Sequence, residues 1–284
     1  MQPLERQTIL ITGATDGLGR ALAAELAGAG ARVLAHGRDD ERGLATVGEI
    51  RDATGNEHVH WLRADLASLD EVRGLADQVI AEYDELHVLV NNAGIGTTLP
   101  GDGQRMESRD GYELRFAVNY LAGYLLTRML MPLLMRSGPA RIVSVSSAGQ
   151  APIDFDDVML ERRYDGVQAY CQSKLAQIMF TFDLAEELGD RGVSATCLHP
   201  ATYMPTKIVT AAGVNPISSL QEGVEATLRL VADPELEGVT GRYFNGLRPA
   251  RAHPQAADPD ARRRLRELSE ELCLAVAGAG QAEA

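Results

Sequence analysis

Residues 8–19 read TILITGATDGLG, and this stretch decides the fold. A short run of apolar and β-branched residues ends at Gly13, and apolar residues then recur at helical spacing up to Leu26. A glycine-rich turn between a strand and a helix is typical of a pyrophosphate site, because free N–H groups and the positive end of the helix dipole favour an anion. A tight turn that binds no ligand remains the alternative.

The turn has the spacing T-G-x-x-x-G-x-G, and each glycine has its own expected use. The first can adopt backbone angles closed to other residues, the second lets a phosphate approach the backbone, and the third lets the helix pack close to the strand. The residues expected to contact a cofactor here are Gly13, Thr15, Asp16, Gly17, Leu18 and Gly19.

Strand-like and helix-like segments alternate along the rest of the chain. Strands are expected at residues 8–12, 32–35, 58–62, 86–90, 141–146, 194–198 and 242–244, and helices at 17–26, 41–53, 69–83, 112–135, 170–188, 221–232 and from 259 onward. Short apolar strands separated by helices predict an α/β fold, a doubly wound parallel sheet of about seven strands with helices on both faces. No linker divides the chain, so we expect one domain over residues 1–284 with a frayed tail at 278–284.

Charge and cysteine content exclude several classes of partner. The 284 residues hold 27 Lys plus Arg against 40 Asp plus Glu, a net charge of −13, which disfavours nucleic acid and anionic lipid surfaces. Three cysteines (Cys171, Cys197 and Cys273) lie far apart without metal-ligand spacing, which predicts neither disulfides nor a metal site. No apolar stretch is long enough to span a bilayer and the first residues are too polar for a signal peptide, so we expect a cytoplasmic protein.

Further motifs follow the glycine turn in a familiar order. They are Asn91-Asn92-Ala93-Gly94, the pair Ser146-Ser147 at the end of the fifth strand, and Tyr170-Cys171-Gln172-Ser173-Lys174. With the turn they cover residues 8 to about 206, and the chain resembles the short-chain dehydrogenase/reductase family. The resemblance implies a Rossmann fold, a nicotinamide cofactor and hydride transfer.

Tyr170 and Lys174 are four residues apart and therefore share one face of a helix. A nearby ammonium favours a phenolate, so we expect a lowered tyrosine pKa that suits acid–base catalysis. Such pairs also occur on exposed helices, and the position after the fifth strand favours catalysis here. The resemblance implies that Ser147 polarises the substrate oxygen and that Asn119 holds a relay water. Strand alternation should turn Ser146 the other way.

The resemblance also assigns the rest of the cofactor site. The second strand ends in Gly37-Arg38, where an NAD-binding enzyme usually carries a carboxylate, so Arg38 predicts a 2′-phosphate and NADP(H). A solvated Arg38 is the alternative, since Asp39 and Asp40 follow it and Asp16 replaces a basic residue of some relatives. The other residues implied in cofactor binding are Asp65, Leu66, Asn92, Ala93, Gly94, Tyr170, Lys174, Pro200 and either Thr202 or Thr206.

Three segments are expected to frame the substrate: residues 95–110, 148–169 and 202–219, the last as a lid. The second is longer than the family's common gap and carries five apolar residues, which resembles the retinol-dehydrogenase-like branch. This suggests a bulky apolar carbonyl or alcohol, and equally a loop that only covers the core or a dimer face.

We therefore expect an NADP(H)-dependent carbonyl reductase or alcohol dehydrogenase acting on a small molecule. By resemblance it would be a dimer or tetramer that pairs through helices 112–135 and 170–188. The alternative is a non-catalytic NADP(H)-binding sensor or scaffold.

Overall fold

A computed structural model describes residues 2–98, 100–101 and 104–279. Its strands are β1 (Thr8–Ile11), β2 (Arg32–Gly37), β3 (Val59–Arg63), β4 (Val88–Asn91), β5 (Ala140–Val145), β6 (Val193–His199), β7 (Arg242–Asn245) and β8 (Arg248–Ala250). They form one sheet in the order β3-β2-β1-β4-β5-β6-β7-β8, and every pair is parallel except β7–β8. The predicted doubly wound α/β fold is confirmed, with the sequence order reversing between β1 and β4.

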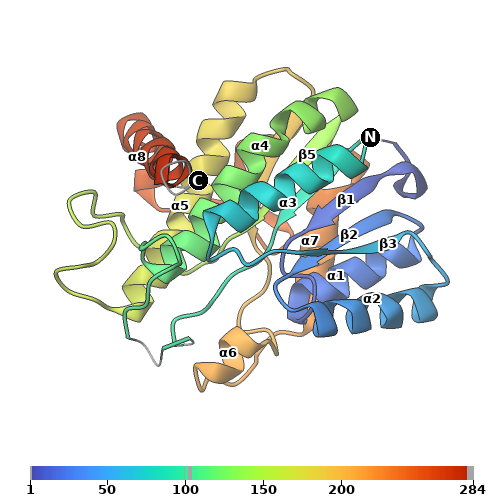
Figure 1. Ribbon diagram of the computed structural model, residues 1–284, viewed down its shortest axis with the longest axis horizontal. Helices are drawn as coiled ribbons and strands as arrows, with labels where there is room; N and C mark the ends of the chain where they lie inside the picture. Colours follow the sequence, from blue (N-terminus) through green and yellow to red (C-terminus); the bar gives the residue numbers. More distant parts are fainter. Residues whose placement is uncertain (1, 99, 102–103, 280–284) are drawn as a thin grey trace.

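Helices cover both faces of the sheet (Figure 1). The α-helices are α1 (Gly17–Gly28), α2 (Asp40–Thr54), α3 (Leu69–Glu82), α4 (Ala122–Ser137), α5 (Gly166–Leu188), α6 (Lys207–Ala211), α7 (Leu220–Ala232) and α8 (Pro259–Ala279). One buried apolar cluster joins the sheet to α1, α2 and α7, and the other joins it to α3, α4 and α5. Burial on both faces explains why the strands are continuous apolar runs.

Polar residues placed at the first turn set where these helices begin. The side chains of Asp39, Ser68, Asp165 and Ser219 each accept a backbone N–H from the first turn of α2, α3, α5 and α7. Asp16 does the same for α1 by accepting the N–H of Gly17. An acceptor at this position satisfies one of the backbone donors that a helix leaves unpaired, so the strand-to-helix turns are encoded locally.

The structure differs from the sequence expectation at several places. The short helix α6 lies in segment 202–219, where no helix was expected. Strand β8 was not expected, because three residues around a proline give no pattern. The helix expected at 112–135 consists of a π-helical turn, η2 (Phe116–Leu121), followed by α4, and Pro132 lies inside α4 rather than ending it. Helix α5 begins at Gly166, four residues before the expected start. Of the tail expected to fray, residues 278–279 belong to α8, and 280–284 lie outside the described residues.

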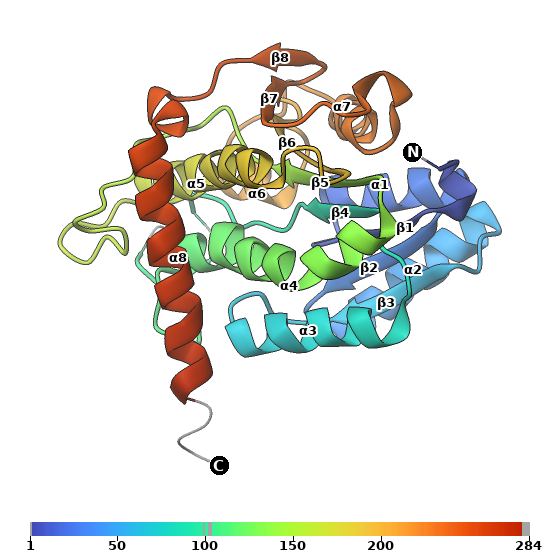
Figure 2. The same ribbon diagram turned by 90° about the horizontal axis from the view of Figure 1, so that it is seen from above.

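Helix α8 packs across α5 and α3 on the outside of the molecule (Figure 2). The Tyr120 hydroxyl of η2 lies 2.7 Å from the Ser269 hydroxyl of α8, and Arg266 of α8 donates to both carboxylate oxygens of Asp183 on α5, each at 2.9 Å. Helix α8 thus lies against η2 and α5, inside the region through which pairing was predicted. The dimer or tetramer stays a prediction.

Candidate active site

The turn after β1 is held in one conformation by the chain that follows β4. The Thr12 hydroxyl accepts the N–H groups of Asn92 and Ala93 at 2.9 and 3.0 Å, and the Asn92 amide nitrogen donates to the carbonyls of Thr12 and Gly13. Gly19 packs directly under the turn, where an added Cβ would lie 2.3 Å from the Gly13 carbonyl oxygen. The NNAG motif therefore locks the glycine turn to the sheet.

Gly13 and Gly17 have φ values of +68° and +51°, which other residues rarely adopt. A Cβ at Gly13 would be 2.9 Å from the Cα of Ala93, so the backbone of the turn runs against the loop after β4. The turn opens onto the first turn of α1, whose N–H groups point out of the helix end. These residues fit a dinucleotide pyrophosphate.

His36 on β2 also holds the glycine turn through a hydrogen bond. It is buried on β2, its Nδ1 accepts the N–H of Gly13 at 3.3 Å, and its Nε2 lies 3.1 Å from the Ala64 carbonyl oxygen. These two bonds require the neutral ring with hydrogen on Nε2. Burial lowers the pKa of His36 to about 4, which keeps the ring in that form.

Ser147 and Tyr170 meet at the carboxyl end of β5. The Ser147 hydroxyl hydrogen-bonds the Tyr170 side chain and also accepts the N–H of Gly149 at 3.0 Å. The Ser146 hydroxyl instead donates to the backbone carbonyl of Lys174 at 2.7 Å. The two adjacent serines thus point in opposite directions, and Ser147 is the one that faces the tyrosine.

Lys174 follows Tyr170 by one turn of α5, with its Nζ 5.8 Å from the centre of the tyrosine ring. The ammonium is buried and donates to the Val145 carbonyl at 3.0 Å and to the Gln177 side-chain oxygen at 2.9 Å. Gly94 lies beside the Lys174 ammonium. A Cβ added to Gly94 would be 3.4 Å from Nζ of Lys174 and 3.3 Å from the side-chain oxygen of Asn119.

Asn119 lies in the π-helical turn η2, a feature often found at functional sites. Its side-chain amide accepts the N–H of Ile95 at 2.8 Å and donates to the Ile95 carbonyl and to the Ser173 hydroxyl. These bonds explain an amide in an apolar helix, and they show that the side chain fixes the loop after β4. Any water that Asn119 holds would therefore have to contact its backbone.

The expected tyrosine pKa is corrected by the structure. Burial raises the pKa of Tyr170 above its ordinary value, and the hydrogen bond from Ser147 only partly opposes this. The lysine that was expected to lower it is itself destabilised as a cation, because burial lowers the pKa of Lys174 to about 7. The tyrosine is thus a neutral phenol near neutral pH.

Where the adenosine was predicted to bind, the two acidic residues next to Arg38 already have hydrogen-bond partners. Asp39 caps α2, and Asp40 accepts the indole N–H of Trp61 at 2.7 Å. Arg38 is exposed, and within the described ranges no ion pair joins it to a carboxylate. The acidic neighbours therefore do not neutralise Arg38 by direct contact.

The negative charge of Asp16 is balanced by two cationic side chains. Its carboxylate lies 2.7 Å from Arg42 of α2 and 3.0 Å from Lys207 of α6, so two cations face one anion at the start of α1. Burial alone would raise the pKa of Asp16, but the bonds from Arg42 and Lys207 bring it below the ordinary value. Although an aspartate stands here in place of a basic residue, its two cationic partners leave this group of three side chains with a net positive charge.

The segment at 202–219 lies over the glycine turn. A Cβ at Gly17 would be 3.2 Å from the Thr206 methyl carbon, and one at Gly96 would be 2.9 Å from the Ile208 side chain. The Thr202 hydroxyl instead lies 3.0 Å from a ring nitrogen of His199, the residue before Pro200. Thr206 is therefore the threonine nearer the turn.

Asp65 and Leu66 follow β3 as expected. The Asp65 carboxylate accepts the N–H of Ala67, while Ser68 caps α3, so Asp65 is not needed as the cap. The Asp65 N–H donates to Glu71 at 2.8 Å.

Two of the segments expected to frame a substrate, 95–110 and 148–169, are held by hydrogen bonds and by burial. Arg115, one helical turn before Asn119, donates to the carbonyls of Gly96 and Thr97 and to the Tyr164 hydroxyl. In the insert expected at 148–169, the apolar residues Ile153, Val158 and Leu160 are buried in the core. The insert therefore covers the core, and most of its apolar side chains are not available to a substrate.

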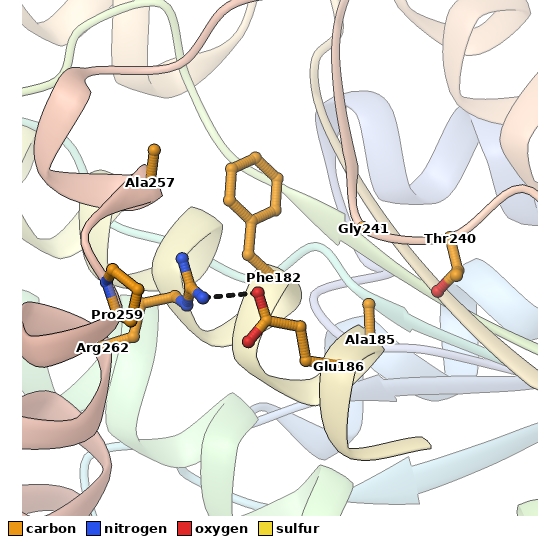
Figure 3. A pocket seen from close by; sticks show the side chains of 8 residues that line it. All are labelled: Phe182, Ala185, Glu186, Thr240, Gly241, Ala257, Pro259 and Arg262. Atoms are coloured by element: carbon orange, nitrogen blue, oxygen red, sulfur yellow. Dashed lines mark hydrogen bonds and ion pairs between the residues drawn. The ribbon is translucent and has the colours of Figure 1, made fainter. Parts of the chain in front are cut away.

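A cavity of about 470 Å³ lies elsewhere, between α5, α8 and the start of β7 (Figure 3). Arg262 and Glu186 form an ion pair across it. Its lining residue Gly241 directly precedes β7, at the amino ends of the strands. This is the opposite edge of the sheet from Ser147 and the glycine turn, so the cavity is not the site described above.

A family model described as short chain dehydrogenase matches residues 7–215. The chain belongs to the short-chain dehydrogenase family. Human retinol dehydrogenase 14 is 37% identical over 93% of this chain and 85% of its own length, and human retinol dehydrogenase 12 is 34% identical over 95% and 87%. This dehydrogenase therefore falls in the retinol-dehydrogenase-like branch, as expected.

Solved structures of similar proteins agree with this family assignment. An uncharacterised protein from Mycobacterium paratuberculosis matches with a TM-score of 0.76, 30% identity, and coverage of 94% of this chain and 93% of that one. A short-chain dehydrogenase of Escherichia coli CFT073, solved with NADPH, matches with a TM-score of 0.69, 26% identity, and coverage of 85% and 96%. Among the described helices of this dehydrogenase, none has the length and hydropathy needed to cross a membrane.

Four residues of the site escaped the sequence analysis: His36, Arg42, Gln177 and Lys207. One signal was available for Lys207. The chain contains only two lysines, Lys174 and Lys207, among its 27 Lys plus Arg residues. Lys174 lies beside Gly94 and Lys207 contacts Asp16, two residues predicted to bind the cofactor. His36 and Arg42 act through contacts between distant segments, which no local pattern shows. Gln177 lies three residues after Lys174 on α5, so its spacing was a local signal that the sequence analysis did not use.

Proposed function

We propose that this dehydrogenase transfers hydride between NADP(H) and a carbonyl or alcohol substrate, with Tyr170 as general acid and base. The observation that supports this most is the contact between the Ser147 hydroxyl and Tyr170 at the carboxyl end of β5, with Lys174 one turn along α5. Parallel sheets bind their ligands at this edge.

The residues have separate tasks in this mechanism. When bound, the nicotinamide supplies or accepts the hydride. In the direction of reduction, the Ser147 hydroxyl donates a hydrogen bond to the carbonyl oxygen as negative charge develops there. Tyr170 gives its phenolic proton to that oxygen, which completes the alcohol, and Lys174 is placed to return a proton toward the tyrosine.

The raised pKa of Tyr170 favours one direction. A neutral phenol is ready to donate a proton, so carbonyl reduction should proceed at neutral pH. Alcohol oxidation needs the phenolate to accept the proton, and we infer that it becomes faster as the pH rises.

NADP(H) is proposed over NAD(H) on the charges at the adenosine end. Arg38 is exposed and forms no ion pair with any carboxylate in the described part of the chain, and Arg42 and Lys207 outnumber Asp16 beside the glycine turn. Guanidinium groups bind phosphate through parallel hydrogen bonds. The Escherichia coli relative solved with NADPH supports the same assignment.

The substrate class rests on the relatives. Because they are named retinol dehydrogenases, we propose an apolar alcohol and its aldehyde, with retinol and retinal as the first to be tried. The exposed apolar residues Tyr203, Ile208 and Ile217 of segment 202–219, rather than the buried insert, would face such a substrate.

The test is NADPH consumption with a panel of aldehydes, ketones and quinones, and NADP⁺ reduction with the matching alcohols. We expect turnover that falls at least ~100-fold in Tyr170→Phe, the lower end of the usual contribution of a general acid. Tight NADPH binding without turnover of any compound would instead indicate a cofactor-binding sensor. Unchanged turnover in Tyr170→Phe would exclude the proposed mechanism.

A further inference from the structure

The Lys174 ammonium has a neighbour with no assigned role. The side-chain oxygen of Gln177 accepts a hydrogen bond from Nζ at 2.9 Å, and both side chains are buried, with exposed fractions of 4% and 5%. Tyr170, Lys174 and Gln177 occupy positions i, i+4 and i+7 of α5 and therefore form one stripe on the helix. The glutamine is thus part of the same face as the tyrosine and the lysine.

Two fixed acceptors hold this ammonium. Gln177 provides one and the Val145 carbonyl at the end of β5 provides the other, at 3.0 Å. An ammonium has three N–H donors, so one donor is left over for a further partner. The pair of acceptors sets the direction in which that third donor points.

The surroundings contain little other charge. The groups that face Nζ are the Val145 carbonyl from β5, Gly94 with the Asn119 amide behind it, and the Tyr170 ring on α5 itself. Tyr170 is the only titratable group among them. No charged side chain contributes to the shift of the lysine pKa, which burial alone brings to about 7.

We propose that Gln177 is a positioning residue that holds the Lys174 ammonium beside Tyr170 and favours its protonated form. This rests on the proposed function, in which Lys174 returns a proton toward the tyrosine. A buried ammonium loses the solvation of water, and an amide oxygen replaces part of it without adding a charge. The lysine is thereby left close to half-protonated near neutral pH, which suits a group that must both hold and release a proton.

Two substitutions of similar size separate this role from simple packing. Gln177→Met keeps the length of the side chain and removes the acceptor, so the pKa of Lys174 should fall by about one unit, a tenfold change in its proton affinity. Gln177→Glu keeps the acceptor and adds a negative charge, so the pKa should rise by about one unit or more. A packing role would not give shifts of opposite sign.

The two lysines make a direct measurement feasible. The full chain labelled with ¹³C at the lysine Cε gives two side-chain signals, and Lys207→Arg identifies the one from Lys174. When that signal is titrated by NMR, we expect the pKa of Lys174 to be lowest in Gln177→Met, intermediate in the wild type and highest in Gln177→Glu. The alkaline limb of kcat/KM against pH should move in the same order.

Three outcomes are distinct. A Lys174 pKa that is unchanged in both variants, or that moves the same way in both, overturns the inference. If either variant fails to fold by circular dichroism, the other still gives the sign of the shift. The NMR titration needs no turnover, so it tests the role of Gln177 independently of the proposed function. Opposite pKa shifts in the two variants would support that role. Full activity of Tyr170→Phe would separately reject the proposed function.

Discussion

Acidification should release the glycine turn through His36. The neutral ring accepts the Gly13 N–H and contacts the Ala64 carbonyl, and a second ring proton would meet the Gly13 N–H with no acceptor between them. Burial lowers the pKa of His36 from 6.5 to about 4, so the unfolded chain binds this proton more readily than the folded one. Stability is fully present above pH 6.5 and is lost as the pH falls toward 4.

The magnitude follows from the shift. A pKa difference of about 2.5 units at about 1.4 kcal/mol each is worth about 3.5 kcal/mol, and the side chain is only 2% exposed, so solvent screening removes little of it. Between pH 4 and 6.5 one proton contributes a slope of about 1.4 kcal/mol per pH unit. His36→Gln should lose that share of the slope.

Urea unfolding across this pH range measures the effect. His87→Gln is a matched control, because His87 is equally buried and its Nδ1 accepts the Thr8 N–H at 3.0 Å, at the amino end of the sheet. Both variants should be less stable at neutral pH, and only His36→Gln should also weaken NADPH binding, by several-fold for a lost hydrogen bond of about 1 kcal/mol. An unchanged pH slope in His36→Gln, or equal loss of NADPH affinity in both variants, would refute the reasoning.

Three further substitutions test other parts of the account. Gly19→Ala places a Cβ 2.3 Å from the Gly13 carbonyl oxygen, so we expect ~1–3 kcal/mol of destabilisation by calorimetry together with weaker NADPH binding; wild-type stability would show that the turn is not tightly packed. Arg38→Ala should weaken NADPH ~10–100-fold by titration calorimetry and NADH hardly at all, and equal losses would remove the phosphate role. Tyr120→Phe removes the bond to Ser269 and should cost about 1 kcal/mol, seen as a fall in Tm of a few degrees; an unchanged Tm would mean that this bond does not hold α8 in place.

Much of the fold could be predicted because each turn carries its own signal. Asp16, Ser68 and the glycines at 13, 17 and 19 specify their strand-to-helix turns locally, and apolar runs specify buried strands. Strand β8 and the π-helical turn at η2 could not be predicted in this way. Their conformation depends on pairing with β7 and on the contact between Asn119 and Ile95, both set by the tertiary structure.

The relative placement of the candidate site residues was predictable from the sequence, and their electrostatics were not. Residue spacing placed Tyr170 and Lys174 on one face, and strand alternation separated Ser147 from Ser146. The expected lowering of the tyrosine pKa was wrong because it treated the ammonium as fully charged, whereas burial reduces that charge. Desolvation depends on everything that surrounds a group, and the sequence around it does not reveal that.

Isotope transfer tests hydride chemistry at this site most directly. NADPH carrying deuterium at both positions of the reactive nicotinamide carbon is incubated with the wild-type protein and the best aldehyde of the panel, and the alcohol is analysed by mass spectrometry. The account predicts one deuterium on the carbinol carbon, formed at least ~100-fold more slowly by Tyr170→Phe. An alcohol without deuterium, or equal rates in the two proteins, would contradict it.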